Sequence, residues 1–573
     1  MKLNPLIFSL SLLFTSFTAF AVPALPGVHR LAQPDGTIVE AEIYGDENFH
    51  YYETTAGELL LRDASGMLRP CVVMPDGSLA AEGEITGVAT SPAQRATIMK
   101  AIAKTETAKA EAAMRIAPGT IKPSFPINGT VTGLILLCEF QDVKFTGQAT
   151  REHYDAVCNT TGYSSEATRG SVVDYFTSQS DGKFTPKFDI FGTVTLPYDR
   201  AHYGLTNDVN NLFRDAALEA DRMGLDFSKY DINNDGFVDF LFVIFAGHGQ
   251  AQGGPYDSVW PAMQDLSEYV FDYFDGLNLG VAACSCELKG GSGANLDGIG
   301  TICHEFSHIL GLADIYDTSQ QGAHGMGHFD IMDRGTYNDN QVTPSGYTAM
   351  DKYTLGWITP TVLDGDAKDV TLDPFDTSHQ AVFIVNPENV DEYYTLENRQ
   401  IQGWDSGLPG HGLVISYCHY EPHLWRRNTV NAVAAGYEHV HIIAADNVWD
   451  EIITANEAGD PFPGTSAVTS FSAYTAPKAT WRSTGKDATF CIKNIRETED
   501  GRIIFDFIAD TASIESIGAY ATGNAVSVAG NTIIAPASAE IFDLCGRRCA
   551  AKGLLPGVYV VKTSATTTKV IVK

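Results

Sequence analysis

The spacing of apolar residues changes several times along the chain, and each change predicts a different kind of structure. Residues 23–87 alternate short apolar runs with turn signals such as Pro34-Asp35-Gly36 and Pro75-Asp76-Gly77, a pattern typical of a small antiparallel β unit. Residues 91–117 are rich in Ala and carry spaced Lys and Arg with little apolar face, which predicts an exposed helix or linker. The prolines that follow end this stretch, so we expect a domain boundary and a proteolytic processing site there.

A mixed α/β pattern comes next. The apolar runs 131–140 and 240–245 are nearly continuous, as expected of strands buried on both faces. Segments 209–223 and 296–312 are the helix candidates. Beyond Trp357 the pattern changes to short strands and turns with little helical periodicity, which predicts an all-β region.

The last residues, from about 511 on, are β-rich and punctuated by glycine. We therefore predict a multidomain α+β protein with a small β-rich N-terminal unit, a mixed α/β domain, a β-sandwich-like domain and a small C-terminal β domain. No internal repeat is visible in the sequence. The predicted boundaries, including an N-terminal signal, give the segments 1–21, 22–117, 118–363, 364–510 and 511–573.

Composition and charge narrow the classes of function. With 44% hydrophobic and 19% charged residues, the 573-residue chain has enough apolar material for several cores. Its 38 basic and 70 acidic residues give a net charge of −32, which excludes nucleic acid as a partner because phosphate binding requires clustered Lys and Arg. Ten cysteines without a CxxC pair are too sparse for a disulfide scaffold.

The N-terminus has the pattern of a secretory signal. An apolar run from Leu6 to Val22 follows Lys2 and ends in the small-x-small triplet Ala19-Phe20-Ala21, so cleavage would leave a chain that begins near Val22. The run is shorter than a membrane-spanning helix requires; a buried N-terminal helix is the alternative. No second candidate span exists in the sequence, so we expect an exported protein, extracellular or at the outer surface, with no transmembrane span.

The strongest chemical motif is His304-Glu305-Phe306-Ser307-His308. Residues four apart project from the same face of a helix, so both imidazoles can place a nitrogen about 2 Å from one Zn²⁺. The carboxylate of Glu305 can then act as a general base toward the attacking water and as an acid toward the leaving amine. The alternative is a helix whose histidines merely lie on a polar surface.

A third zinc ligand is expected shortly after the motif. Gly311 predicts the end of the helix, since glycine enters the left-handed conformation readily. The chain then reverses and can bring the carboxylate of Asp314 to the metal. The spacing H-E-x-x-H-x-x-G-x-x-(His or Asp) resembles that of the metzincins. Asp317 and Glu397 are competing carboxylates.

Two downstream features support this interpretation. The segment Phe329-Asp330-Ile331-Met332-Asp333 resembles the Met-turn beneath metzincin zinc sites, although a lone Met is usually an ordinary core residue. Tyr337 follows closely and is a candidate hydrogen-bond donor to the oxyanion of the tetrahedral intermediate. A tyrosine that simply packs in a loop is the alternative.

A separate acidic loop predicts either a calcium site or an Asx-rich turn. Its side-chain oxygens stand at alternate positions around Gly236, as in a calcium loop. The distant bidentate Glu of an EF-hand is missing, because Phe242 occupies that position, so the turn interpretation stays open. The candidate Ca²⁺ ligands are Asp231, Asn233, Asp235 and Asp239.

Beyond these motifs, strings along most of residues 30–420 resemble the immune-inhibitor-A-type metallopeptidases, a family of secreted bacterial zinc proteases. The resemblance implies a metzincin-like catalytic domain, an N-terminal propeptide, Zn²⁺ as cofactor and endopeptidase activity on proteins. Ser307 and Ala313 depart from the Gly and Pro usual in the family, but both are compact. The strings include Gln33-Pro34-Asp35-Gly36-Thr37, Val259-Trp260-Pro261, Leu355-Gly356-Trp357 and Leu396-Glu397-Asn398-Arg399.

The C-terminal segment resembles a different family. Residues 541–547, 554–562 and 570–573 are similar to the sorting domain of type IX secretion. The resemblance implies delivery across the outer membrane of a Gram-negative bacterium, with the outer-membrane secretion machinery as a partner. An ordinary small β domain is the alternative.

Together these features predict a secreted zinc metalloendopeptidase that is made as a latent precursor and hydrolyses proteins or peptides. An inactive surface adhesin or binding protein on a protease scaffold is one alternative, and the intact Glu305 speaks against it. A glycoprotein-specific protease, with the 364–510 domain binding glycan, is the other. For latency, the thiol of Cys71 is a candidate metal ligand, but we expect a strand cysteine there and a propeptide that simply blocks the site.

Overall fold

The computed structural model describes most of the chain from residue 22 onward, and the predicted signal at 1–21 lies outside the described residues. No helix in the described part is both long and apolar enough to cross a membrane. The described ranges are 22–47, 49–115, 125–205, 209–267, 269–448, 454–509, 527–529, 531–535, 539–543, 548–554, 557–562 and 567–572.

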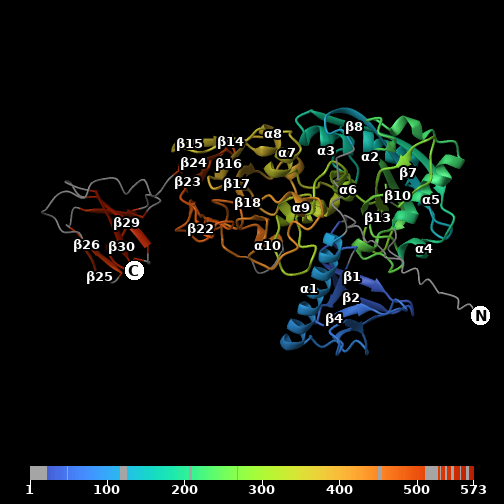
Figure 1. Ribbon diagram of the computed structural model, residues 1–573, viewed down its shortest axis with the longest axis horizontal. Coiled ribbons are helices and arrows are strands. Elements are labelled where there is room, and N and C mark those ends of the chain that lie inside the picture. The colour runs from blue at the N-terminus through green and yellow to red at the C-terminus, as the bar shows by residue number, and fades with distance from the viewer. Residues whose placement is uncertain are drawn as a thin grey trace, which may run out of the picture.

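The N-terminal unit is a six-stranded antiparallel sheet in which each strand pairs with its neighbour in sequence, followed by helix α1 (Pro92–Arg115) (Figure 1). The predicted helix is therefore confirmed, but one of its faces is packed rather than exposed. Ile98 and Ile102 lie one turn apart and share a buried cluster with Tyr51, Leu59 and Cys71. The strands are β1 (Val28–Ala32), β2 (Ile38–Gly45), β3 (His50–Thr54), β4 (Leu59–Arg62), β5 (Leu68–Val73) and β6 (Leu79–Ala81).

The central sheet has five strands in the order β11-β13-β10-β7-β8. Four of them run parallel, and the edge strand β11 is antiparallel to β13. The two apolar runs predicted as buried strands are confirmed as β7 and β10. The strands are β7 (Gly129–Glu139), β8 (Phe184–Thr195), β10 (Leu241–His248), β11 (Met263–Asp265) and β13 (Val281–Leu288).

Both faces of this sheet are covered, which explains why its central strands read as continuous apolar runs. Along β7, Ile135 and Leu137 belong to one hydrophobic cluster, whereas Leu134 and Leu136 belong to the other. Helices α2, α3 and α6 contribute to the first cluster and α5 to the second (Figure 1). Their bounds are α2 (Arg151–Asn159), α3 (Val172–Gln179), α4 (Arg200–Gly204), α5 (Val209–Arg222) and α6 (Gly300–Ile309).

Two sheets beyond Trp357 share a third hydrophobic cluster, which contains Tyr394 and Ile415 on one sheet and Ile492 and Phe505 on the other. One has the order β14-β16-β17-β18-β19 and the other β15-β24-β23-β20. The strands are β14 (Thr361–Val362), β15 (Ala367–Leu372), β16 (Ala381–Asn386), β17 (Asn389–Arg399), β18 (Gly412–His419), β19 (Val440–Ile442), β20 (Phe471–Ser472), β23 (Cys491–Glu497) and β24 (Ile503–Ile508).

The first of these sheets also packs against the central domain. Phe383 and Tyr393 belong to the same cluster as Phe306 of helix α6, so one core runs across residue 363. The sheet is thus buried on both sides, and its strands position groups that reach the site described below. Short helices in this region are α7 (Ala349–Thr354), α8 (Phe375–Ser378), α9 (Pro422–Trp425) and α10 (Thr454–Glu457).

The regular elements of the described C-terminal segments are strands, in a two-stranded pair β25-β26 and a four-stranded sheet β28-β27-β29-β30. Tyr559, Val561 and Val572 contribute to a small cluster of their own. The strands are β25 (Ser527–Ala529), β26 (Thr532–Ile534), β27 (Glu540–Asp543), β28 (Arg548–Cys549), β29 (Gly557–Lys562) and β30 (Thr567–Val572).

Several short elements complete the description. Four two-residue strands of the described chain form the separate pairs β9-β12 and β21-β22. They are β9 (Phe237–Val238), β12 (Asn278–Leu279), β21 (Thr480–Trp481) and β22 (Lys486–Asp487), and the 3-10 turns are η1 (Phe227–Tyr230), η2 (Gln250–Gln252), η3 (Gly327–Phe329), η4 (Arg334–Gln341) and η5 (Gly403–Asp405).

Candidate metal centre

Helix α6 carries both motif histidines and ends where the sequence predicts. Gly311 has a φ of +102°, its N–H donates to the carbonyl of His308 (2.9 Å), and the N–H of Leu312 donates to the carbonyl of Ser307 (3.1 Å). These two bonds form a Schellman motif, which reverses the chain directly after the helix. The reversal brings Asp314 back over the helix face that carries the two imidazoles.

The three predicted metal ligands converge in the buried interior. The Nε2 atoms of His304 and His308 are 3.1 Å apart, and they lie 3.2 Å and 3.3 Å from Oδ1 of Asp314. Ligands about 2 Å from one zinc ion at tetrahedral angles are about 3.3 Å from one another. The three side chains are thus already at the spacing that a zinc ion requires.

Hydrogen bonds on the far side of each ring determine which nitrogen faces the centre. Nδ1 of His304 lies 2.7 Å from the carbonyl oxygen of Ile331, and Nδ1 of His308 lies 2.9 Å from that of Leu312. A carbonyl only accepts, so each Nδ1 carries the ring proton and each Nε2 keeps its lone pair. The carbonyl for His304 comes from the residue before Met332, in the predicted Met-turn.

The donor set fits a cation. Two imidazole lone pairs and one carboxylate oxygen face each other, and among the described residues Oδ1 of Asp314 has no hydrogen-bond donor. Three acceptors at this distance repel one another unless positive charge lies between them. Burial by itself would raise the pKa of Asp314, but the imidazoles of His308 and His304 outweigh burial and hold that pKa below its ordinary value. Burial lowers the pKa of His308, which favours the neutral, metal-binding ring.

Asp314 is held in place by a residue that the sequence did not single out. Its backbone N–H donates to Oδ1 of Asn428 (2.6 Å), and the side-chain amide of Asn428 donates to Oδ2 of Asp314. Oδ2 is thereby occupied and Oδ1 is left for the metal. Nothing in the local pattern around residue 428 indicates this role, because the two residues are 114 positions apart.

The two competing carboxylates have other partners. Asp317 closes its own turn, since Oδ1 accepts from the N–H of Ser319 (2.8 Å) and Oδ2 from that of Gly322 (2.7 Å). Glu397 lies in β17 and accepts from Nη1 of Arg399 (2.9 Å). Both carboxylates are therefore engaged away from the imidazoles, which favours Asp314 as the third ligand.

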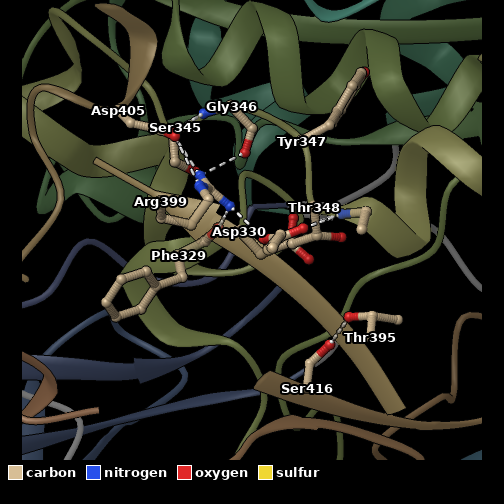
Figure 2. Close-up of polar contacts among 12 residues, drawn as sticks. Phe329, Asp330, Ser345, Gly346, Tyr347, Thr348, Thr395, Arg399, Asp405 and Ser416 are labelled. Carbon is tan, nitrogen blue, oxygen red and sulfur yellow. Dashed lines mark hydrogen bonds and ion pairs between the residues drawn. The ribbon is translucent and has the colours of Figure 1, made fainter. Parts of the chain in front are cut away.

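Arg399 itself ties the β region to the loop beneath the metal centre (Figure 2). Its guanidinium is fully buried and binds both carboxylate oxygens of Asp405 (2.6 Å and 2.7 Å). It also donates to the carbonyl oxygens of Phe329 (3.0 Å) and Gly346 (3.1 Å). A planar fork with several acceptors is a rigid support, so Arg399 fixes both ends of the segment that contains Met332 and Tyr337.

The start of the described chain lies against Glu305. The backbone N–H of Val22 donates to Oε1 of Glu305 (3.0 Å), and the carbonyl of Val22 accepts from Nε1 of Trp260 (3.0 Å). The hydroxyl of Tyr337 donates to the carbonyl of Pro23 (2.5 Å). Peptide groups of residues 22 and 23 thus bind the two side chains that the sequence assigns to catalysis, and Val22 is fully buried.

The electrostatic surroundings of Glu305 are unusual for a carboxyl group. Burial, and then the negative charge of Asp314, raise its pKa well above the ordinary value. Glu47, from the N-terminal unit, is also buried, and burial followed by the charges of Asp46 and Asp314 raises its pKa as well. No sequence motif indicates that a carboxyl group of the N-terminal unit is influenced by the charge of Asp314.

The predicted calcium ligands form a compact turn. The carboxylate of Asp239 accepts from the N–H of Ile232 (2.6 Å) and the side-chain amide of Asn233 (2.9 Å). Asp231 accepts from the N–H groups of Asp235 (3.0 Å) and Gly236 (3.1 Å). These bonds are those of an Asx-rich turn, the alternative that the sequence left open.

Cys71 lies in β5, as a strand cysteine should. It packs in the cluster of Tyr51, Leu59 and Ile98, and burial raises the pKa of its thiol to about 11. A thiol with a raised pKa is a poor metal ligand, because the thiolate is the form that binds.

Comparison with known proteins adds a family to this geometry. Residues 137–357 match the immune inhibitor A peptidase M6 catalytic domain. The chain is also 28% identical over 276 residues to "Immune inhibitor A" of Bacillus thuringiensis subsp. alesti, an alignment that covers 38% of this chain and 38% of that protein. The chain thus spans well under half of the relative's length. The matched segment includes His304, Glu305, His308 and Asp314, and the family supports a metallopeptidase.

Proposed function

We propose that the protein is a zinc-dependent metalloendopeptidase with His304, His308 and Asp314 as its metal ligands. The observation that carries the proposal is the convergence of three buried acceptors at 3.1–3.3 Å beside the carboxyl of Glu305. When bound, Zn²⁺ would act as a Lewis acid that polarises a carbonyl group and lowers the pKa of water toward neutral pH. An adhesin on an inactive scaffold would need neither the matched ligand spacing nor a carboxyl beside it.

Two side chains are assigned to the chemical step. Glu305 takes a proton from the attacking water and returns it to the leaving amine, and its raised pKa suits a group that must hold that proton in between. The hydroxyl of Tyr337 already donates to a peptide carbonyl, that of Pro23. We assign Tyr337 the same hydrogen bond to the carbonyl oxygen of a substrate, where it would strengthen as charge develops on the oxygen.

The precursor is proposed to be latent because residues 22–25 occupy the position of a substrate. Besides the bonds of Val22 and Pro23, the N–H of Leu25 donates to the carbonyl of Ala251 (2.8 Å). Removal of a signal after residue 21 would turn the nitrogen of Val22 into an α-ammonium group facing Glu305. An ammonium paired with that carboxylate neutralises the general base as well as excluding substrate. Cleavage within residues 95–122 would separate the N-terminal unit from the rest of the chain.

Export, sorting and calcium binding complete the proposal. The signal pattern at residues 1–21 supports secretion, and the strands between 540 and 572 are where the type IX resemblance lies. Removing residues 516–573 should trap the protein in the periplasm without abolishing the activity of processed protein. Undiminished secretion of the truncated chain would contradict the sorting role. Calcium at Asp231, Asn233, Asp235 and Asp239 would displace the backbone bonds of that turn.

The peptidase proposal is tested by incubating processed protein with a peptide library, with and without a zinc chelator. Cleavage that the chelator removes and that added Zn²⁺ restores is the expected result. The bonds cut would also define the specificity. No cleavage by zinc-loaded, processed protein would overturn the proposal.

A further inference from the structure

The loop that carries Asn428 connects strand β18 to strand β19 and comprises residues 420–439. Besides the two bonds from Asn428 to Asp314, Asn431 donates to the carbonyl oxygens of Ile315 and Val440 (both 2.6 Å). The conformation of this loop therefore determines where the third metal ligand lies. The pairing of β18 with β19, in which Cys418 lies opposite Val440, already joins the two ends of this loop.

The two ends of the loop carry a second group of metal-binding side chains: His419, Glu421 and His439. One ligand atom from each lies within 4.8 Å of the other two. Nδ1 of His419 and Nδ1 of His439 are each 4.0 Å from Oε1 of Glu421, and the two rings stack with centroids 5.4 Å apart. Nδ1 of His439 donates its proton to the carbonyl oxygen of His419 (3.1 Å), so this ring must give up that bond before its Nδ1 can bind an ion. All three side chains are partly exposed, so an ion from solvent can reach them.

The backbone fixes the two histidines side by side. The N–H of His419 donates to the carbonyl of His439 (2.7 Å), and the N–H of His439 donates to Oδ1 of Asn431 (2.9 Å). The position of one candidate ligand is thus linked directly to the asparagine that holds Ile315. An ion that immobilises the two histidines would therefore also restrain Asn431, through the bond from the N–H of His439.

We propose that His419, Glu421 and His439 bind a second divalent cation of the zinc class, which adds a cross-link at the base of the loop and so steadies Asp314. Two imidazoles and one carboxylate suit Zn²⁺ or Co²⁺, whereas Ca²⁺ and Mg²⁺ prefer oxygen ligands alone. The separations exceed the roughly 3.3 Å of a closed tetrahedral site, so the side chains must move inward by about 1 Å, and His439 must exchange its bond to the carbonyl of His419 for the ion. The second site should therefore bind more weakly than the buried one.

Binding through Nδ1 of His419 places the ring proton on Nε2. That nitrogen lies 3.2 Å from the side-chain amide nitrogen of Asn389, so the amide would turn its oxygen toward the ring. His423 lies beside the same carboxylate, with Nδ1 3.5 Å from Oε2 of Glu421, and leaves Oε1 to the metal. The site would exist whether or not the chain is a peptidase.

The test is a titration of the full chain, beginning at Val22, with Co²⁺ alone. Two equivalents with the visible absorption of tetrahedral Co²⁺ are expected for the unchanged protein. His419→Ala and His439→Ala should each bind one equivalent of Co²⁺ normally. Each variant should bind the second equivalent at least tenfold more weakly than the unchanged protein does. The His304→Ala/His308→Ala double variant should lose the other equivalent and keep this one. His411→Ala is the matched control, because His411 is a half-exposed histidine paired with Glu497 (3.0 Å), and it should keep both.

A second measurement separates lost metal binding from lost folding. Hydrogen exchange at residues 428–431 should slow when the second equivalent binds, and His439→Gln, which removes the ligand but keeps a polar side chain, should abolish that slowing. The inference would be overturned if the unchanged protein bound only one equivalent of Co²⁺ and the His304→Ala/His308→Ala variant lost it. Two equivalents that survive both His419→Ala and His439→Ala would overturn it as well. Failure of the peptidase proposal would show instead as two bound ions without cleavage of peptides.

Discussion

The side-chain amide of Asn428 binds Asp314 twice, once at its backbone N–H and once at its carboxylate. This pair of bonds fixes both the position and the rotation of the carboxylate, so that Oδ2 is occupied and Oδ1 points at the imidazoles of His304 and His308. A group that orients a metal ligand in this way contributes to metal affinity without touching the metal.

Replacing Asn428 should therefore weaken zinc binding. For Asn428→Ala we expect a loss of about 10- to 100-fold in zinc affinity, the range typical of lost partners of metal ligands. Competition with a chelator of known affinity measures the change. Asn431→Ala is the control, since it loosens the same loop but leaves both bonds to Asp314 intact. An equal loss in the two variants would mean that the loop as a whole, rather than the amide of Asn428, orients the carboxylate.

Glu305→Gln separates metal binding from catalysis. The amide is isosteric with the carboxylic acid but cannot take a proton from water, so we expect a fall of about 10²- to 10⁴-fold in turnover with zinc still bound. Peptide cleavage and zinc content are measured on the same processed preparation. Full activity in this variant would remove Glu305 from the mechanism, and loss of zinc would show that its role is structural.

Latency should depend on the first residues of the propeptide. Deleting residues 22–25 removes the groups bonded to Glu305, Trp260 and Tyr337, so the uncleaved precursor should hydrolyse peptides before any cut within residues 95–122. Cys71→Ala is the matched control and should stay latent, because that thiol is packed in the core of the N-terminal unit. A deleted precursor as inactive as the unchanged one would place the block elsewhere in the propeptide.

The local features of the site were predictable because their signals are local. The four-residue spacing of His304 and His308, and Gly311 as the helix end, depend only on helix geometry and on the conformational freedom of glycine. The apolar run at 131–140 likewise predicts a strand buried on both faces, and β7 confirms it. These features require no knowledge of distant segments.

The contacts that complete the site could not be predicted, because they join segments far apart in the sequence. Val22 meets Glu305 across 283 positions, and Asn428 meets Asp314 across 114. Asn428 lies in no periodic pattern or motif, and the signal pattern that ends at Val22 says nothing of a contact with Glu305. Each residue acts through a position that tertiary packing gives it. For the same reason the packing of helix α1 could not be predicted. Its Ile98 and Ile102 are isolated apolar residues in the sequence, but they pack in the core of the N-terminal sheet.

The third ligand is decided by comparing three carboxylates. Asp314→Ala leaves two imidazoles, and losing one of three protein ligands should reduce zinc affinity by orders of magnitude. Asp314→His should restore part of it, since the chain reversal at Gly311 already aims this position at the metal. Asp317→Ala should keep a full equivalent of zinc, because its carboxylate serves only its own turn.

Glu397→Ala should also keep its zinc but unfold more easily. The variant leaves the buried guanidinium of Arg399 without one of its two carboxylate partners, and breaking a buried ion pair costs about 3–5 kcal/mol. Zinc per chain after dialysis and the midpoint of denaturant unfolding are measured for Glu397→Ala beside Asp314→Ala and Asp317→Ala. The assignment of Asp314 is wrong if Asp314→Ala keeps a full equivalent of zinc while Asp317→Ala or Glu397→Ala loses it. The third ligand is then the carboxylate whose removal causes the loss of zinc.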